Sequence, residues 1–151
     1  ELLGEEGNYK GFDIVIGNPP YGVALSDIEK AKLSEKYVHQ DYQLDTYLIF
    51  MELGLRIAKE NGQLAFIVPN TWLTNLKLKK IRSHITHDNY VSSIAHYHRK
   101  IFDEAVVDTQ TLFARKNSSR NKNIVVKVFD DPQDHTSHFA DQDEWAAMAG
   151  D

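Results

Sequence analysis

One stretch near the amino terminus, Phe12–Tyr21, contains the side chains best suited to do chemistry. It begins as a short apolar run rich in β-branched residues, which predicts a strand buried on both faces. Gly17 ends that strand, and Pro19 and Pro20 fix their own φ angles, offer no N–H group and hold the preceding residues extended. The side-chain amide of Asn18 is therefore expected at the carboxyl end of the strand, where open α/β sheets bind ligands.

The sequence Asn-Pro-Pro-Tyr directly after an apolar strand resembles the catalytic motif of S-adenosylmethionine-dependent amino methyltransferases, above all the adenine-specific DNA methyltransferases. An aromatic amine is a poor nucleophile because its lone pair is delocalised into the ring. Two acceptors at hydrogen-bond distance, about 2.9 Å, would engage both amine hydrogens and turn the lone pair toward a methyl donor. The Asn18 side-chain oxygen and the Pro19 carbonyl can supply these acceptors, and Tyr21 offers a flat face for a base. The alternative is a rigid Pro-Pro turn without chemistry.

Two later stretches follow in the order found in type II (type IIG-like) restriction–modification adenine methyltransferases, so the resemblance spans most of the chain. Leu64–Leu73 resembles the fifth strand and its loop, and Ile101–Phe113 resembles a late motif followed by an antiparallel strand. The resemblance implies that the target adenine is flipped out of the duplex and lies between Tyr21 and Phe102. An ordinary core phenylalanine is an equally good interpretation of Phe102.

The cofactor that the resemblance implies is S-adenosylmethionine, and Phe50 matches an aromatic residue that contacts its adenine. The glycines before the motif, Gly4, Gly7 and Gly11, lack the G-x-G spacing behind a strand, so the main cofactor-binding loop is absent. We therefore expect the carboxyl-terminal part of a catalytic domain that is inactive by itself. Its implied partners are the amino-terminal half of that domain, a target-recognition domain, and DNA bound through the full-length enzyme.

The composition narrows the remaining possibilities. Charged residues make up 26% and hydrophobic residues 42% of 151 residues, which is typical of one globular domain. The absence of cysteine excludes disulfides, thiolate zinc sites and cytosine-carbon methylation, which needs a thiolate nucleophile. A net charge of −5 argues against DNA binding by this chain alone. Because no run approaches membrane-spanning length, we expect a cytoplasmic protein without a membrane partner.

The hydrophobic pattern predicts the elements that position the motif. The strongest helix pattern runs over Leu44–Glu60, and Asn61-Gly62 is expected to end that helix as its C-cap. A buried strand over Gln63–Val68 follows. A strand, a helix and a second strand predict a right-handed parallel βαβ unit. The first strand, Phe12–Ile16, should then have an unpaired edge that favours self-association.

The rest of the pattern completes an α/β fold, a partial Rossmann-like methyltransferase sheet that is mostly parallel, has an antiparallel late hairpin and is flanked by helices. A helix is expected over about 75–85 and a strand over 91–97. The strand over 124–129 is expected to pair in a hairpin with the strand before it. Residues 1–130 are the predicted partial catalytic domain, and 131–151 are predicted to be a linker toward the absent target-recognition domain.

The histidines do not predict a metal site from their spacing. His96 and His98 share one strand face, and His135 and His138 lie close together in the tail. Without a carboxylate at a recognisable spacing, we expect surface residues and no metal.

Two other functions remain open. Protein-glutamine amide methyltransferases share Asn-Pro-Pro-Tyr, although the later stretch Ile101–Phe113 fits the DNA enzymes better. A non-catalytic α/β interaction module would keep the turn and have lost the chemistry.

Overall fold

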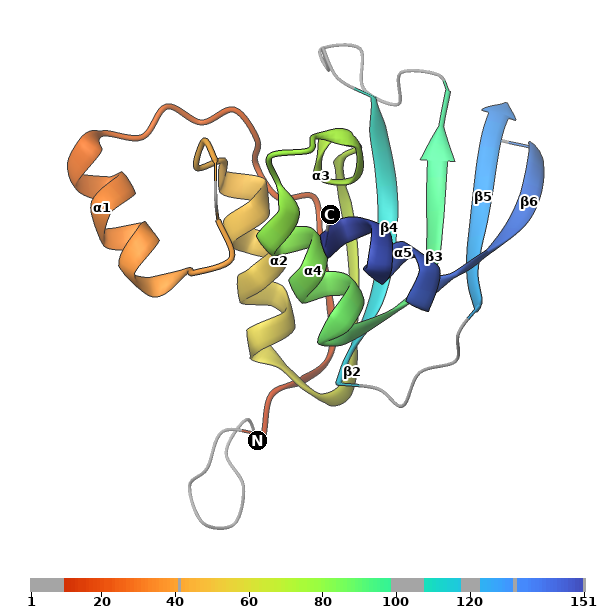
Figure 1. Cartoon of the computed structure of the whole chain (residues 1–151), viewed down its shortest axis with the longest axis horizontal. Coiled ribbons are helices and arrows are strands. Elements are labelled where there is room, and N and C mark those ends of the chain that lie inside the picture. The colour runs from red at the N-terminus through yellow and green to blue at the C-terminus, as the bar shows by residue number, and fades with distance from the viewer. Residues whose placement is uncertain (1–9, 41, 99–107, 118–122, 132, 151) are drawn as a thin grey trace.

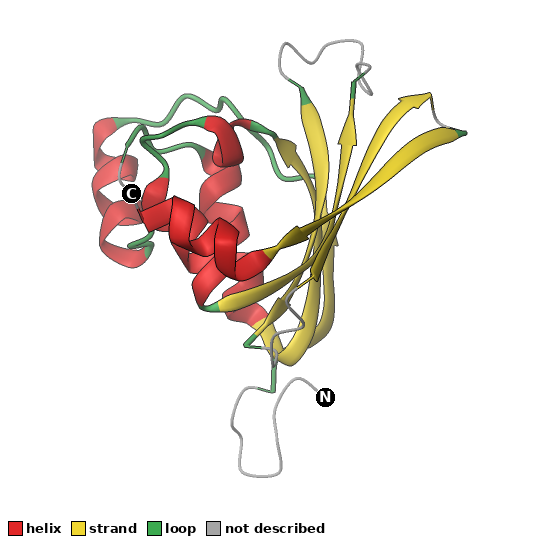
Figure 2. Cartoon of the chain, turned by 45° about the vertical axis from the view of Figure 1, so that its right-hand side comes forward, coloured by secondary structure: helices red, strands yellow, loops and turns green. Residues whose placement is uncertain are grey.

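The computed structural model describes residues 10–40, 42–98, 108–117, 123–131 and 133–150. The described elements form two layers, a sheet of six strands and a set of helices packed against one face of it (Figures 1 and 2). In Figure 2 the opposite face of the sheet carries none of the described helices.

Four of the six strands run in the same direction. The strands are β1 (Phe12–Gly17), β2 (Ala58–Pro69), β3 (Asn89–Tyr97), β4 (Thr109–Lys116), β5 (Asn123–Asp131) and β6 (Asp134–Asp141). Their order across the sheet is β1-β2-β4-β3-β5-β6, with β4 and β6 antiparallel to their neighbours and β1, β2, β3 and β5 sharing one direction. This confirms the predicted mostly parallel α/β sheet. The carboxyl ends of β1, β2, β3 and β5 therefore lie at the same end of the sheet.

The hydrophobic core lies between this sheet and the helices. The helices are α1 (Asp27–Lys36), α2 (Thr46–Ile57), α3 (Thr71–Thr74), α4 (Lys79–His87) and α5 (Gln142–Gly150). The core side chains with 2% or less of their surface exposed include Leu48, Met51 and Leu55 of α2, Ile81 and Ile85 of α4, and Leu64, Ile94, Leu112 and Ile124 of the strands. No described helix is long and apolar enough to cross a membrane.

The helix α1 contributes nothing to this core. It begins with a complete capping box, in which the Ser26 side chain accepts from the Glu29 N–H and the Glu29 carboxylate accepts from the Ser26 N–H. None of its residues is buried, and in Figure 1 it lies on the far side of α2 from the sheet. Local capping therefore stabilises α1 more than packing does.

The predicted parallel βαβ unit is confirmed for β1, α2 and β2. Ile16 of β1 pairs with Ala65 of β2 in a parallel register. Gly54 lets α2 lie close to β2, because a Cβ atom there would stand 2.6 Å from Leu64 Cδ1 and 3.1 Å from Phe66 Cζ. This close contact brings one side of α2 next to the strand that carries the motif.

The predicted end of the long helix was wrong. The helix α2 ends at Ile57, and β2 begins at once with Ala58. The Asn-Gly pair lies inside β2, where the register with β1 shifts between Phe12 and Ile14 and Asn61 has φ 61°. Asparagine and glycine tolerate positive φ in a bulge as well as in a helix cap, so the local preference did not decide between the two.

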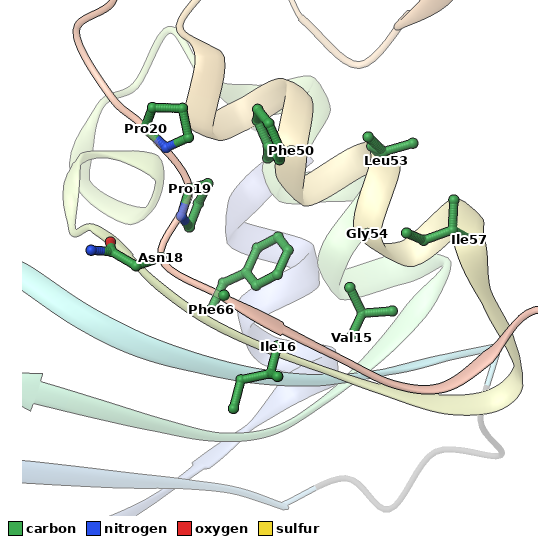
Figure 3. Close-up of a pocket in the computed structure, with 11 residues that line it drawn as sticks. Val15, Ile16, Asn18, Pro19, Pro20, Phe50, Leu53, Gly54, Ile57 and Phe66 are labelled. Atoms are coloured by element: carbon green, nitrogen blue, oxygen red, sulfur yellow. The ribbon is translucent and has the colours of Figure 1, made fainter.

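The prediction that the first strand is buried on both faces was also wrong. Ile14 is 61% exposed and Ile16 is 79% exposed. Figure 3 shows Ile16 pointing away from α2, and Ile14, two residues earlier in the strand, lies on the same face. The predicted unpaired edge is present: β1 pairs with β2 alone among the described strands. Whether this edge drives self-association stays a prediction.

The late part of the sheet differs from the expected hairpin. Both edges of β4 are already occupied, by β2 and β3, so β5 pairs in parallel with β3 instead. The antiparallel hairpin is formed by β5 and β6. Residues 131–151, expected to be a linker, therefore include a strand and the helix α5, which packs on α4. The connection of this segment to a target-recognition domain stays a prediction.

Candidate functional site

The Asn-Pro-Pro-Tyr turn lies at the end of the sheet where the parallel strands have their carboxyl ends. Gly17 is the last residue of β1, and Asn18 follows it with an exposed side chain. Pro19 is buried, Pro20 is exposed and Tyr21 is half-buried. The turn is therefore anchored in the protein by the buried Pro19, whereas the side-chain amide of Asn18 is exposed to solvent.

Two residues at the start of α2 hold the turn in place. The Thr46 hydroxyl donates to the Pro20 carbonyl at 2.6 Å, and the Gly22 N–H donates to Asp45 Oδ1 at 3.1 Å. Asp45 stands at the N-cap position of α2 but makes no side-chain capping bond there, so its carboxylate serves the turn instead. Neither residue was predicted from the sequence, because both lie within the helix expected over Leu44–Glu60 and the turn that they hold is distant in the sequence.

The two acceptors expected from the sequence are both open. No described residue donates a hydrogen bond to the Asn18 carboxamide or to the Pro19 carbonyl, whereas the Pro20 carbonyl is taken by Thr46. Figure 3 shows the Asn18 amide pointing away from Phe50 and Phe66. An amide oxygen and a carbonyl oxygen in adjacent residues are thus available to a ligand with two N–H groups.

A cavity of about 280 Å³ lies between β1 and α2 next to this turn. It is lined by Val15–Pro20 on one side and by the α2 residues Phe50, Leu53, Gly54 and Ile57 on the other, with Phe66 between them (Figure 3). Phe50 is 39% exposed although its ring is apolar. Asn18 is the single polar side chain of this lining, so the cavity suits a flat apolar group rather than an anion.

The structure brings together some of the predicted site residues and leaves others apart. Asn18, Pro19, Pro20 and Phe50 line the same cavity. Tyr21 does not line it; its ring packs against the hydrophobic core. The proposed second stacking residue, Phe102, lies outside the described residues.

Hydrogen bonds and ion pairs connect the elements around the cavity. The Tyr47 hydroxyl of α2 lies 2.8 Å from Thr71 Oγ1 just after β2, and burial raises the pKa of Tyr47 to about 12. This phenol therefore stays neutral over the physiological range and ties α2 to the start of α3. On the other side, Lys59 pairs with Asp13 and lowers the pKa of that carboxyl, which joins β2 to β1.

Arg82, one of the basic residues of α4, has an internal role. Its Nη1 donates to the carbonyls of Trp72 and Asn75, each at 2.9 Å, and to that of Leu73 at 3.3 Å. These carbonyls belong to α3 and to its C-cap residue, Asn75. The last carbonyls of a helix have no partner within the helix, and here Arg82 supplies one. The charge of Arg82 thus stabilises the segment after β2 from within.

Solved structures with the same arrangement of strands and helices define the class of the fold. The type IIG restriction endonuclease BpuSI superposes with a TM-score of 0.74 at 20% identity, over 91% of this chain and 20% of that one. The EcoKI M protein of a type I restriction enzyme gives a TM-score of 0.61 at 24% identity, over 84% of this chain and 27% of that one. The chain thus has the α/β fold found in these restriction–modification proteins.

Sequence comparison identifies the family. The sequence model of the Eco57I restriction-modification methylases matches residues 2–102, two thirds of the chain. The type II restriction enzyme and methyltransferase RM.Eco57I of Escherichia coli is 30% identical over 120 residues, 76% of this chain and 12% of that protein. The type II methyltransferase M.BstVI of Geobacillus stearothermophilus is 30% identical over 122 residues, 78% of this chain and 22% of that protein. The chain belongs to the Eco57I restriction-modification methylase family, and it spans less than a quarter of either relative.

Proposed function

We propose that this chain contributes the amine-binding part of an enzyme that transfers a methyl group from S-adenosylmethionine to the exocyclic amine of adenine in DNA. The observation that carries the proposal is the pair of open acceptors, the Asn18 carboxamide and the Pro19 carbonyl, beside an apolar cavity. The family supports methyl transfer, and the named relatives are DNA methyltransferases. The choice of adenine rests on the motif.

The two acceptors act on the geometry of the amine. Hydrogen bonds from both amine hydrogens to the Asn18 and Pro19 oxygens draw the nitrogen toward a tetrahedral shape and turn its lone pair out of the ring plane. A fixed turn performs this without reorganisation at the moment of reaction, which is the main advantage of preorganised dipoles. Thr46 and Asp45 are positioning residues, because they hold the turn that carries the two acceptors.

The cavity residues fit one end of S-adenosylmethionine. Phe50 offers a half-exposed ring as a stacking face for the adenine, and the other lining residues exclude water from it. When bound, the cofactor supplies an electrophilic methyl group. The described lining contains no carboxylate for the ribose hydroxyls, so we assign that contact and the glycine-rich loop to the amino-terminal half of the catalytic domain.

The substrate arrangement follows the family resemblance. A flipped adenine would be held between Tyr21 and Phe102, with Tyr21 supplied by the same turn as the acceptors. Recognition of the DNA sequence and most of the phosphate contacts are assigned to other parts of the full-length protein. The net charge of −5 on this chain supports that division, because non-specific DNA affinity comes mainly from cationic side chains.

The proposal is tested by methylation assays on the full-length parent protein and its Asn18→Ala variant. Loss of one preorganised hydrogen-bond acceptor should lower kcat by about 100-fold or more, with the melting temperature unchanged because Asn18 is exposed. Asn18→Asp, which keeps acceptor oxygens at that position, should retain more activity than the alanine variant. Gln43→Ala removes an exposed amide outside the Asn-Pro-Pro-Tyr turn and serves as the matched control.

The methylated product separates the competing functions. Digestion of the DNA and mass spectrometry should detect N6-methyldeoxyadenosine. Methylated glutamine in a release-factor-like protein, with unmodified DNA, would instead identify an amide methyltransferase. Unchanged methylation by Asn18→Ala would favour an interaction module.

The division of the cofactor site has its own test. Isothermal titration of S-adenosylmethionine into the 151-residue chain should show no measurable binding, because these residues hold only the adenine end. Tight binding would contradict the assignment of the main cofactor loop to another part of the protein.

A further inference from the structure

A second cavity, of about 350 Å³, lies on a different face of α2 from the motif cavity and shares no lining residue with it. Its walls combine two imidazoles and two carboxylates: His39 from the segment after α1, Glu52 from α2, and His84 and Asp88 from the end of α4. None of these four residues was predicted as a site from the sequence, and none has a role in the proposed methyl transfer.

The side chains of His39, His84 and Asp88 converge. His84 and Asp88 are one helical turn apart, so they lie on the same face of α4, with Nδ1 of His84 2.8 Å from Oδ2 of Asp88. The His39 ring stacks on the His84 ring with centroids 3.8 Å apart and an angle of 11° between the planes. One ligand atom from each of the three residues lies within 4.8 Å of the other two.

Glu52 fixes the position of His39. Its carboxylate is 8% exposed and accepts the backbone N–H groups of Val38 at 3.2 Å and of His39 at 3.1 Å. Nδ1 of His39 is buried and lies 3.2 Å from Glu52 Oε1, yet it makes no well-oriented hydrogen bond to any described residue. A buried nitrogen without such a partner is costly unless something else binds it.

The cations at the rim of this cavity interact with groups other than these carboxylates. Lys116 donates from Nζ to the carbonyls of Arg56 at 3.0 Å and Ala58 at 2.8 Å. The Arg56 guanidinium lies 5.0 Å from the centre of the Tyr37 ring and donates to its hydroxyl. The negative charge of Glu52 and Asp88 is therefore available to a third group beside the imidazoles.

We propose that His39, His84 and Asp88 bind a divalent first-row transition-metal ion of the Zn²⁺ type. Two imidazole nitrogens and one carboxylate oxygen are a donor set that such ions accept, with water completing a tetrahedral shell. Ligand atoms at about 2.0–2.2 Å from the metal lie closer together than 4.8 Å, so binding draws the three side chains inward. The side chain of Asp88 is exposed, which permits that movement.

The metal would act as a structural clamp. It joins the segment between α1 and α2, which follows the Asn-Pro-Pro-Tyr turn, to the carboxyl end of α4. Glu52 is a positioning residue in this arrangement, because its carboxylate accepts the backbone N–H of His39 and lies beside the imidazole ring. The inference does not depend on the proposed methyl transfer.

The test is titration of the 151-residue chain with Co²⁺ and Zn²⁺. Co²⁺ should bind with a stoichiometry of one, produce the visible absorption of a tetrahedral site and be displaced by Zn²⁺. His84→Ala and Asp88→Asn should each weaken Zn²⁺ binding by at least about tenfold, and Glu52→Gln should weaken it by about 10–100-fold. Asp88→Asn changes an exposed side chain and keeps the fold, so it tests the site even where His84→Ala unfolds.

His138→Ala is the matched control, since it removes an exposed histidine from β6 and should leave the affinity unchanged. The melting temperature of the wild-type chain should also be higher with Zn²⁺ than with a chelator, and the Asp88→Asn variant should not show this difference. Absence of Zn²⁺ binding, or equal affinity in the wild type and Asp88→Asn, would overturn the proposal and leave a stacked histidine pair with a packing role alone.

Discussion

The strand that carries the motif and the strands at the centre of the sheet are held in different ways. On β1, Ile16 is 79% exposed, whereas Leu64 on the neighbouring β2 is completely buried. The central strands have a strand on each side and helices on one face; β1 has a single described strand neighbour. The candidate chemistry thus lies at the margin of the fold, and the stability of this chain comes from its centre.

The carboxyl-terminal segment belongs to the stable region although its composition is polar. Gln142, the first residue of α5, is completely buried between α4 and β3. A polar residue at such a position is tolerated because each of its groups has a partner. The comparison therefore predicts that substitutions near Gln142 change stability, while those near Asn18 change activity.

Replacing Gln142 with alanine should have the largest effect on stability. Its Oε1 accepts the Val91 N–H at 2.8 Å, and its Nε2 donates to the carbonyls of Thr86 at 2.8 Å and Asn89 at 2.7 Å. All three partners would be left buried, so we expect the free energy of unfolding to fall by about 3–5 kcal/mol. Urea denaturation measures the loss. Gln43→Ala, an exposed glutamine, should change it by less than about 0.5 kcal/mol; equal effects of the two variants would contradict the assigned role of Gln142.

Replacing Gly54 with alanine should have an intermediate effect, because Gly54 lies where α2 contacts the sheet. The added methyl group would stand 2.6 Å from Leu64 Cδ1, and the resulting shift should cost about 1–3 kcal/mol even though alanine favours a helix. Thermal and urea denaturation check it. Gly22→Ala in the turn region meets no atom within 4 Å and has φ +68°, so its cost should be limited to about 1 kcal/mol of backbone strain. If Gly54→Ala lowered the free energy of unfolding less than Gly22→Ala, the predicted difference between the α2–sheet contact and the turn region would be wrong.

Replacing Ile16 with serine should have the smallest effect. Its side chain already lies in solvent, so we expect the free energy of unfolding of the 151-residue chain to change by about 0.5 kcal/mol or less. Sedimentation velocity should also show less self-association, because the substitution makes the exposed face of the edge strand more polar. A loss above about 2 kcal/mol would mean that another surface already covers this strand.

Much of the motif region was predictable because its conformation is set by neighbouring residues. Two prolines restrict the backbone after β1 whatever the rest of the chain does, and the position of Asn18 at the carboxyl end of the strand was predicted. The α2 periodicity was equally clear. Thr46 and Asp45 were not anticipated as supports of the turn, since the contact joins residues that are distant in the sequence.

The sequence by itself determined the turn, the helix periods and the α/β class, because these follow from local backbone preferences and short-range hydrophobic spacing. Only the tertiary structure decided that Asn61-Gly62 forms a bulge, that β5 pairs with β3, and that His39 stacks on His84. Those outcomes depend on which surfaces and strand edges are already occupied when distant segments meet. No short stretch of sequence contains that information.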